Sequence, residues 1–450
     1  MQQSLTVDGL ASLAVPKKNS MLTVVLSSFI GNTIEYYDFL AYGLGAALVF
    51  GRLFFPNVSS LTAVLASFAT FGVGFLARPL GGVFFGHLGD TIGRKQTLII
   101  TLVGMGVASC LIGALPTYNQ VGVLAPVLLV LLRFLQGFAV GGEWGGAMLV
   151  VVENAPANHR GFYSAWPQTG GFSGQLLATG AFALVAFLPD DQLLSWGWRL
   201  PFLVSGVLVG VGLYMRAKLE ETPVFKQVLE EEKKGEEAVH HASPVVEVIR
   251  TSWRSLLLIM VLRFAESVPF FMVTVFAVSY ATGQLGVSRQ VMLSVIMICC
   301  VIAFPMHGLF GALSDRVGRR PIYIFGAIAA AALAFPFFYL LQSGSFFLML
   351  LGYVLLINVA HNSINAVQPS FFTELFGPRV RYSGASIGAQ LGAIVAGGFT
   401  PFIAKGLSAA DGGGWRLVAA YVVIVSLISA AAAYFGPETS KRELTEEHPQ

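Results

Sequence analysis

The chain has 450 residues, of which 55% are hydrophobic and only 11% are charged, and its mean hydropathy is +0.72. Soluble proteins carry about a quarter charged residues, so this composition excludes an ordinary soluble domain and indicates a membrane protein. The net charge is only +3, and no part of the chain forms a basic domain, which argues against a nucleic-acid partner. The cysteines, Cys110, Cys299 and Cys300, lie in apolar runs and form neither a disulfide framework nor a metal motif.

Apolar runs long enough to cross a bilayer, about 20 residues for roughly 30 Å of hydrocarbon, occur twelve times along the chain. The first run follows Lys17 and Lys18 and lacks a small-residue cleavage site, so it predicts an uncleaved span and not a signal peptide. The runs lie at 21–50, 61–86, 97–115, 121–150, 161–188 and 199–218, and at 255–282, 289–314, 321–341, 345–373, 382–406 and 414–436. We therefore predict an all-α membrane protein with 12 transmembrane helices.

The two sets of six runs are separated by a charged stretch, 219–254, and they repeat each other. GHLGDTIGRK, from Gly86 to Lys95, follows the second run, and GALSDRVGRR, from Gly311 to Arg320, follows the eighth. Matching Gly, Leu, Asp and Arg positions predict two six-helix bundles related by a parallel repeat, with a substrate site near the midplane between them. The predicted domains are an N-terminal bundle (1–218), a cytoplasmic linker loop (219–254) and a C-terminal bundle (255–450).

Lysine and arginine residues between the runs are concentrated on one side of the membrane. Most of the 27 lie on the side that bears both termini and the charged stretch. The opposite side holds only Arg52, Arg199, Arg289, Lys405 and Arg416. Because positively charged loops remain in the cytoplasm, both termini are predicted to be cytoplasmic.

The repeated loops have a physical interpretation of their own. Gly86 and Gly93 permit a tight reversal, and Asp90 can cap the next helix or pair with Arg94. A turn that fixes topology is the simpler interpretation, and a gating role is the alternative. The candidate gating residues are Gly86, Asp90, Gly93 and Arg94 in the first half, and Asp315, Gly318 and Arg319 in the second.

Twelve spans in two sets of six, with this loop after spans two and eight, resemble the major facilitator superfamily. GNTIEYYDFLAYG in span one, RFLQGFAVGGEWGGA in span four, SWGWRLPF from Ser195 and RYSGAS from Arg381 are similar to its metabolite:proton symporter family. The resemblance implies the major facilitator fold, loops that lock a cytoplasmic gate, and proton symport through alternating access. It further implies a functional monomer of the cell inner (plasma) membrane, without cofactor or metal, that imports a shikimate-like or other carboxylate metabolite. A zwitterionic solute such as betaine or proline is the alternative substrate.

Ionisable residues deep in the predicted spans are candidates for function, because each costs about 2.5 to 3.5 kcal/mol to insert. Most of them lie in spans one, four, seven and ten, which is the spacing expected if the first helix of each three-helix unit lines a shared cavity. The deep set consists of Glu35, Asp38, Arg133, Glu143, Arg263, Glu266, His307 and His361, with His307 the weaker candidate of the two histidines.

Span one carries Glu35 and Asp38 three residues apart on one helix face, with Tyr42 one turn beyond. Two buried carboxylates this close cannot both ionise without cost, so one of them is expected to hold a proton. Such a carboxylate suits proton symport, and a salt bridge to Arg133 or Arg263 is the alternative. The further candidates for proton coupling are Glu143 and Glu266.

Arginine suits a substrate carboxylate because its planar fork can donate two parallel hydrogen bonds. Arg263 also lies three residues before Glu266, so an internal ion pair is possible. Span ten presents a row of asparagines, which is improbable in lipid unless it faces water or a hydroxylated ligand. His361 beside that row is either a satisfied core residue or a ligand. The substrate-binding candidates are Arg133, Arg263, Gln136, Tyr42, Asn358, His361, Asn362, Asn365 and Gln390.

Other classes of protein are less consistent with these residues. The sequence lacks a GxxxxGK[ST] nucleotide-binding loop, so ion gradients must supply the energy. We predict no enzyme, because the buried carboxylates and histidines form neither a metal-ligand cluster nor a nucleophile–base pair. A membrane-embedded receptor or channel remains the alternative from another class. Arg78, next to Pro79, is interpreted as an anchor at the cytoplasmic interface.

Overall fold

The computed structural model describes residues 21–92, 94–141, 144–217, 248, 250–377, 381–442 and 444, and within these ranges the regular structure is helical throughout. The first half comprises α1 (Met21–Gly45), η2 (Ala46–Phe50), α2 (Gly51–Phe54), α3 (Ser60–Ile92), α4 (Arg94–Ala114), α5 (Tyr118–Val121), α6 (Leu124–Val140), α7 (Trp144–Asn154), η3 (Ala157–His159), α8 (Arg160–Val185), α9 (Asp190–Ser195), η4 (Gly197–Arg199) and α10 (Leu200–Ala217). The second half comprises α13 (Trp253–Phe271), η5 (Met272–Phe276), α14 (Ala277–Gly283), α15 (Arg289–Val317), α16 (Arg319–Gln342), α17 (Phe346–Tyr353), η6 (Val354–His361), α18 (Asn362–Glu374), α19 (Arg381–Ala393), η7 (Ile394–Gly398), α20 (Thr400–Ala410) and α21 (Arg416–Phe435).

Each of the twelve predicted runs is helical in the structure, the fourth being divided between α6 and α7, so the predicted all-α class is confirmed. Some segments are interrupted: π-helical stretches η2, η5, η6 and η7 join successive helices of the runs that start at 21, 255, 345 and 382. Eight described helices are long and apolar enough to cross a membrane, and two shorter apolar ones, Ile99–Ala114 and Leu124–Val140, correspond to the third and fourth runs. The remaining segments, α1 and α8, carry buried polar residues along their length.

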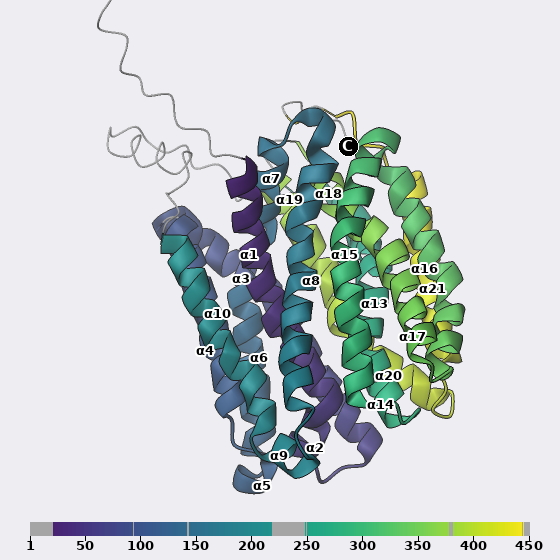
Figure 1. Ribbon diagram of the computed structural model, residues 1–450. Coiled ribbons are helices and arrows are strands. Elements are labelled where there is room, and N and C mark those ends of the chain that lie inside the picture. The colour runs from purple at the N-terminus through teal and green to yellow at the C-terminus, as the bar shows by residue number, and fades with distance from the viewer. Residues whose placement is uncertain are drawn as a thin grey trace, which may run out of the picture.

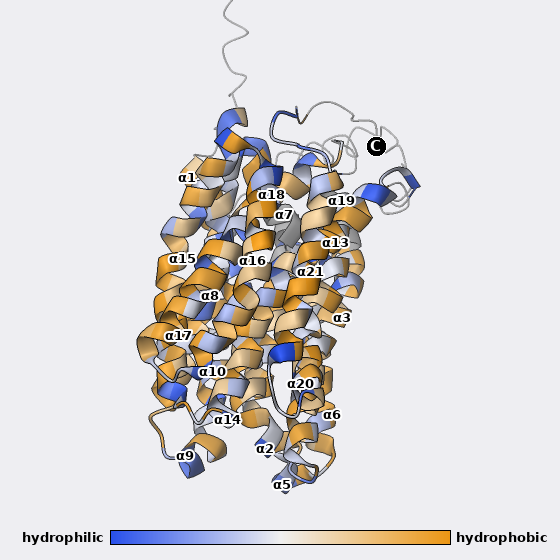
Figure 2. Ribbon diagram, turned by 90° about the vertical axis from the view of Figure 1, so that its right-hand side faces the viewer, coloured by the Kyte–Doolittle hydropathy of each residue, from blue (hydrophilic) through white to orange (hydrophobic). Residues whose placement is uncertain are grey.

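The two halves of the chain form two groups of helices that lie side by side. In Figure 1 the purple-to-teal helices lie mostly on the left and the green-to-yellow helices on the right, with α8 beside α15 at the boundary. The start of α1 and the C-terminus lie at the same end, which we call the terminal end, and α5 and α9 lie at the opposite end. Figure 2 shows hydrophobic residues over the middle of the helices and hydrophilic residues gathered at both ends, as a bilayer requires.

Glycine permits close helix packing within the first group. A Cβ on Gly137 of α6 would lie 1.9 Å from the carbonyl oxygen of Gly74 on α3, so any larger residue would force these helices apart. The two groups meet along α8 against α15, and along α3 against α19, η7 and α20. This interface brings the polar faces of α1, α13, η6 and α18 toward the centre of the molecule.

Candidate functional site

The first bundle buries Arg133 completely. Its Nη1 donates to Gln136 Oε1 at 2.5 Å, and its guanidinium lies 4.0 Å from the ring centre of Phe39 and 4.2 Å from that of Tyr42. Gln136 in turn donates to the Ser109 hydroxyl at 2.7 Å. In this conformation Arg133 is therefore engaged by residues of its own bundle, although its sequence position suggested a substrate ligand.

The two carboxylates of α1 have different partners. Asp38 is 1% exposed and accepts a hydrogen bond from the Ser205 hydroxyl on α10. Glu35 forms an ion pair with Arg78 on α3, with 3.2 Å between Glu35 Oε1 and Arg78 Nη2. The two carboxylates thus have different partners, and the expectation that one of them holds a proton stays a prediction. Arg78 is also not an interfacial anchor, because it is 8% exposed and paired with a buried carboxylate.

Arg78 lies where the two bundles meet. Its guanidinium packs on the rings of Phe39 (4.0 Å) and Phe75 (4.6 Å), and Phe75 contacts Phe271 of the second bundle edge-on at 5.5 Å. Sequence analysis named Arg78 only as an anchor, although an arginine twelve or more residues inside an apolar helix was an available signal of function.

In the second bundle several predicted residues converge on Glu266. Arg263 Nη1 lies 3.0 Å from Glu266 Oε2, which also accepts from the Ser267 hydroxyl at 2.6 Å. Asn365 Nδ2 donates to Glu266 Oε1 at 3.2 Å, and His361 Nε2 lies 3.5 Å from the same oxygen. The predicted Arg263–Glu266 pair is confirmed, and residues from three helical segments surround it.

Two of the three asparagines of η6 and α18, Asn358 and Asn362, bind each other, and the third, Asn365, binds Glu266 and His307. Asn358 Nδ2 donates to the Cys299 carbonyl at 3.1 Å, Asn362 Nδ2 donates to Asn358 Oδ1 at 2.8 Å, and Asn362 Oδ1 lies 3.0 Å from His361 Nδ1. His307, the weaker candidate, lies 2.9 Å from Asn365 Oδ1 and is fully buried. We call this connected set the Glu266 cluster: Arg263, Glu266, Ser267, His307, Asn358, His361, Asn362 and Asn365.

The space beside the Glu266 cluster is small in this conformation. A cavity of about 10 Å³, lined in part by Phe172, Phe270 and Cys299, has room for roughly one water molecule. Entry of a substrate therefore requires the bundles to separate. Among the residues that the structure describes, no group of three or more His, Cys, Asp or Glu side chains could hold a metal ion.

The remaining candidates lie apart from this centre or outside the described part of the chain. Tyr42 donates to the Thr70 hydroxyl at 2.8 Å within the first bundle, and Gln390 is buried on α19. Glu143 and Gly93 lie outside the described residues. For Gly86, Asp90 and Arg94 the structure describes only their positions in α3 and α4.

At the terminal end, Asp315 joins the two bundles. Its carboxylate accepts from the backbone N–H groups of Gly161 (2.8 Å) and Phe162 (2.9 Å), in the first turn of α8, where the helix dipole favours negative charge. Arg319 Nη1 pairs with Asp315 Oδ1 at 2.8 Å and so holds the carboxylate in place. Gly318, with φ of +112°, adopts a backbone conformation that favours glycine and ends α15.

The change Asp315→Asn is expected to loosen this contact. The amide can accept from only one of the two backbone donors and carries no charge, and each charge-assisted bond contributes about 1.5–3 kcal/mol. Spin labels at the exposed positions Ala157 and Arg316 should then report an added population at longer distance. An unchanged distance distribution would mean that Asp315 does not hold the bundles together, and Asp411→Asn at the opposite end is the matched control.

At the opposite end, Asp190 of the first bundle bridges to Arg289 of the second at 2.9 Å and to Arg52 at 3.2 Å. Hydrogen bonds from Arg289 and then Arg52 lower the pKa of the Asp190 carboxyl. A lowered pKa keeps the carboxylate charged, so the bridge holds at neutral pH and is lost only as the pH falls below the ordinary carboxyl range. Because the pair is exposed, it stabilises this end by only about 0–1 kcal/mol.

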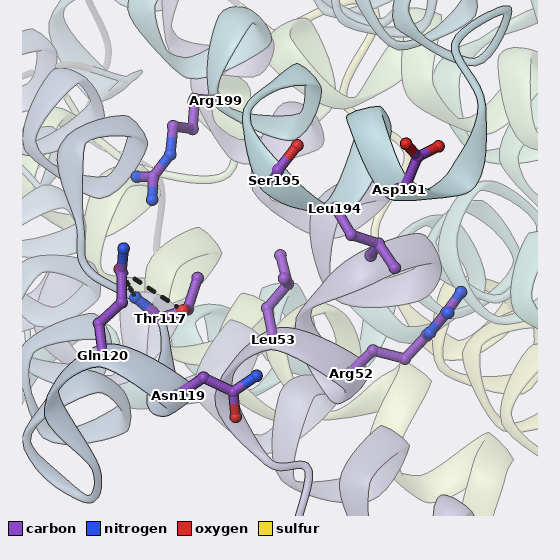
Figure 3. A pocket seen from close by; sticks show the side chains of 9 residues that line it. All are labelled: Arg52, Leu53, Thr117, Asn119, Gln120, Asp191, Leu194, Ser195 and Arg199. Atoms are coloured by element: carbon purple, nitrogen blue, oxygen red, sulfur yellow. Dashed lines mark hydrogen bonds between the residues drawn. The ribbon is translucent and has the colours of Figure 1, made fainter.

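Beside this bridge lies an open pocket of about 480 Å³, whose lining includes Arg52, Asp191 and Arg199 (Figure 3). Arg199 already donates to the carbonyl groups of Gly113 and Leu115. The pocket is lined only by residues of the first bundle, and Arg52 is the one lining residue that also takes part in the Asp190 bridge. Its size alone therefore does not make it the functional centre.

Two six-helix bundles that meet over buried ion pairs, with contacts between them at both ends, define a transporter that alternates access to a central site. The chain belongs to the sugar (and other) transporter family, whose sequence pattern matches residues 23–449. Its resemblance to the major facilitator superfamily is thereby confirmed, and the enzyme class is excluded.

Similar proteins agree with this family. The chain is 46% identical to the shikimate transporter of Escherichia coli (strain K12), over 91% of this chain and 92% of that protein. It is 36% identical to a glycine betaine/proline/ectoine/pipecolic acid transporter of Dickeya dadantii (strain 3937), over 93% and 84%. The xylose transporter from E. coli in a partially occluded inward-open conformation superposes with a TM-score of 0.71 at 20% identity, covering 94% and 99% of the two chains. This last likeness concerns the fold alone.

Proposed function

We propose that this protein imports a small hydroxylated carboxylate, of which shikimate is the leading candidate, together with protons. The observation that carries the proposal is a pair of arginines, Arg78 and Arg263, held on opposite bundles by Glu35 and Glu266. A carboxylate between two such guanidinium groups would gain charge-assisted hydrogen bonds from both bundles. Bundle closure and substrate binding would then be coupled.

The relatives support this substrate class. The E. coli shikimate transporter shares 46% of its aligned residues with this chain, and the arginines account for an anionic substrate. The betaine and proline transporters, at 35–36% identity, support a zwitterion as the second candidate. A zwitterion also carries a carboxylate, so only its positive group distinguishes it, and competition experiments can separate the two.

We also propose how the chain is organised in its membrane. Residues 1–218 and 255–450 form the two moving bundles, joined by the 219–254 linker, in a monomer of the inner (plasma) membrane with cytoplasmic termini. The distribution of lysine and arginine supports this orientation, which makes the Asp315 contact a cytoplasmic gate and the Asp190 bridge a periplasmic one. The proton gradient drives transport without a cofactor. Asp38 is the proposed coupling site of the first bundle; Glu143 remains a sequence-based proposal.

Uptake in proteoliposomes tests this function. With an acidic exterior, labelled shikimate should accumulate above its external concentration, which a receptor or a passive channel would not do. Benzoate, which lacks the hydroxyl groups, should compete at least about tenfold less well, because each buried partner left unpaired costs about 1–3 kcal/mol. Competition by betaine with none from carboxylic acids would contradict the proposal and favour the zwitterion.

A further inference from the structure

The hydrogen bonds of the Glu266 cluster determine which nitrogen of His361 carries a hydrogen. A backbone carbonyl can only accept, so Asn358 must direct its Nδ2 to the Cys299 carbonyl (3.1 Å). Asn358 Oδ1 then accepts from Asn362 Nδ2 (2.8 Å), and Asn362 Oδ1 is left facing His361 Nδ1 (3.0 Å). Because Asn362 Oδ1 is an acceptor, His361 Nδ1 must carry an N–H. Turning the Asn358 or the Asn362 amide would place two donors or two acceptors opposite each other in another of these contacts.

The other ring nitrogen of His361 then has no hydrogen when the imidazole is neutral. His361 Nε2 lies 3.5 Å from Glu266 Oε1 and is a buried atom without a hydrogen-bond partner. Both side chains are almost fully buried, at 1% and 3% exposure. Two lone pairs that face each other in a site of low dielectric repel, and one added proton between them converts the repulsion into a charge-assisted hydrogen bond.

A second chain of hydrogen bonds ends at the same carboxylate oxygen. The Ala303 carbonyl lies 3.1 Å from His307 Nδ1, so this nitrogen is the donor and His307 Nε2 is an acceptor in the neutral ring. Nε2 nevertheless faces Asn365 Oδ1 at 2.9 Å, while Asn365 Nδ2 donates to Glu266 Oε1 at 3.2 Å. If the Asn365 amide is rotated, its Nδ2 can donate to His307 Nε2, but its Oδ1 then faces Glu266 Oε1. Two acceptors again face each other. Each of the two series of hydrogen bonds therefore lacks one hydrogen: the first between His361 Nε2 and Glu266 Oε1, and the second between His307 Nε2 and Asn365 Oδ1.

Among the residues that the structure describes, no side chain other than Asn365 donates a hydrogen bond to Glu266 Oε1, and none donates to His361 Nε2. Arg263 and Ser267 engage the second oxygen, Oε2, and the Tyr323 hydroxyl donates to the Leu262 carbonyl. Phe270 stacks on the His361 ring at 5.0 Å, and Phe172 of the first bundle contacts it at 6.0 Å, so closure of the bundles covers the cluster. The titratable and charged groups facing Glu266 and His361 are Arg263 on α13, His307 on α15, Tyr323 on α16 and Tyr36 on α1.

We infer that Glu266, His361 and His307 form a proton-binding site in the second bundle, separate from Asp38, and that the bundles close over it only when it is protonated. A proton from water adds to the lone pair of His361 Nε2, and the new N–H donates to Glu266 Oε1; no bond between heavy atoms forms or breaks. The proton returns to water when the bundles separate. The role in transport rests on the proposed function, whereas the proton site itself rests on the hydrogen bonds.

Substrate exchange at equal pH on both membrane faces tests the inference, because exchange requires closure but no gradient. Wild-type exchange should fall about tenfold for each pH unit above the titration of the site, as loss of one proton requires. The amide of His361→Gln can place a permanent N–H near the position of Nε2, so the exchange that this variant shows should lose the alkaline decline, whatever its absolute rate. His159→Gln, at an exposed histidine, is the matched control and should keep the wild-type profile. An alkaline decline in His361→Gln equal to that of the wild type would overturn the inference.

A second measurement is needed in case the His361→Gln variant does not insert into the membrane. It also separates this inference from the proposed function. Nitrogen NMR of histidine-labelled protein should show an imidazole with hydrogens on both nitrogens, and this signal should weaken or disappear in Glu266→Gln at the same pH because the anionic partner is lost. This readout needs no substrate, so it stands even if no tested acid is transported. If all buried imidazoles are neutral at every pH at which the protein is folded, the proton site does not exist.

Discussion

Changing Arg78 to lysine is expected to raise the apparent KM for a carboxylate substrate about tenfold or more while the protein still inserts. The guanidinium is held by Glu35 at 3.2 Å and lies on the rings of Phe39 and Phe75, so its fork has one fixed orientation at the bundle interface. Lysine keeps the charge but loses the fork and the flat ring contact. A hydrogen bond to a charged group contributes about 1.5–3 kcal/mol, which corresponds to roughly tenfold or more in affinity. Uptake of labelled shikimate over a range of concentrations measures the change.

Two comparisons separate substrate binding by Arg78 from a structural role. The uncharged methyl ester of shikimate should inhibit wild type and Arg78→Lys equally, because it has no carboxylate for the guanidinium to bind. If Arg78 serves only to neutralise Glu35, then the double variant Arg78→Gln, Glu35→Gln should restore normal uptake, and that result would contradict the prediction. Arg416→Lys, at an exposed arginine at the start of α21, is the matched control and should leave the KM unchanged.

Asp38→Asn is expected to abolish accumulation against a concentration gradient and to leave substrate exchange in place. Asp38 is 1% exposed and hydrogen-bonded to Ser205, and asparagine has a similar shape but cannot bind a proton in the working pH range. A gradient of one pH unit supplies about 1.4 kcal/mol per proton, enough for about tenfold accumulation by the wild type. The variant should only equilibrate the substrate. Parallel measurements of gradient-driven uptake and of exchange distinguish the two activities.

A matched exposed change serves as the control for Asp38. Asp191→Asn, in the pocket of Figure 3, alters the same chemical group at an exposed position at the end of the first bundle and should accumulate substrate as the wild type does. An Asp38→Asn protein that still concentrates substrate in response to the pH gradient would show that coupling depends on other groups. The Glu266 cluster would then be the first place to look for them.

The membrane class, the number of spans and the two-fold repeat could all be predicted from the sequence, because each depends on composition and spacing along a single chain. Apolar length alone decides whether a segment can cross a bilayer, and the Gly–Asp–Arg loops mark equivalent points of the two halves. The rarity of ionisable residues in the spans also identified Asp38, Arg263, Glu266 and His361 as candidates, since each such residue is costly in lipid.

The partners of those residues depended on how the helices pack and rotate, which local sequence does not specify. Glu35 and Asp38 share a face of α1, yet one meets Arg78 on α3 and the other meets Ser205 on α10, because α1 lies between these two helices. The asparagines of span ten could equally have faced a ligand. They pair with one another or with neighbouring side chains because α15 and α18 pack so closely that the Cys299 carbonyl and His307 complete their hydrogen bonds. Arg78, interpreted from sequence as an anchor, became a central residue only when the second bundle covered it.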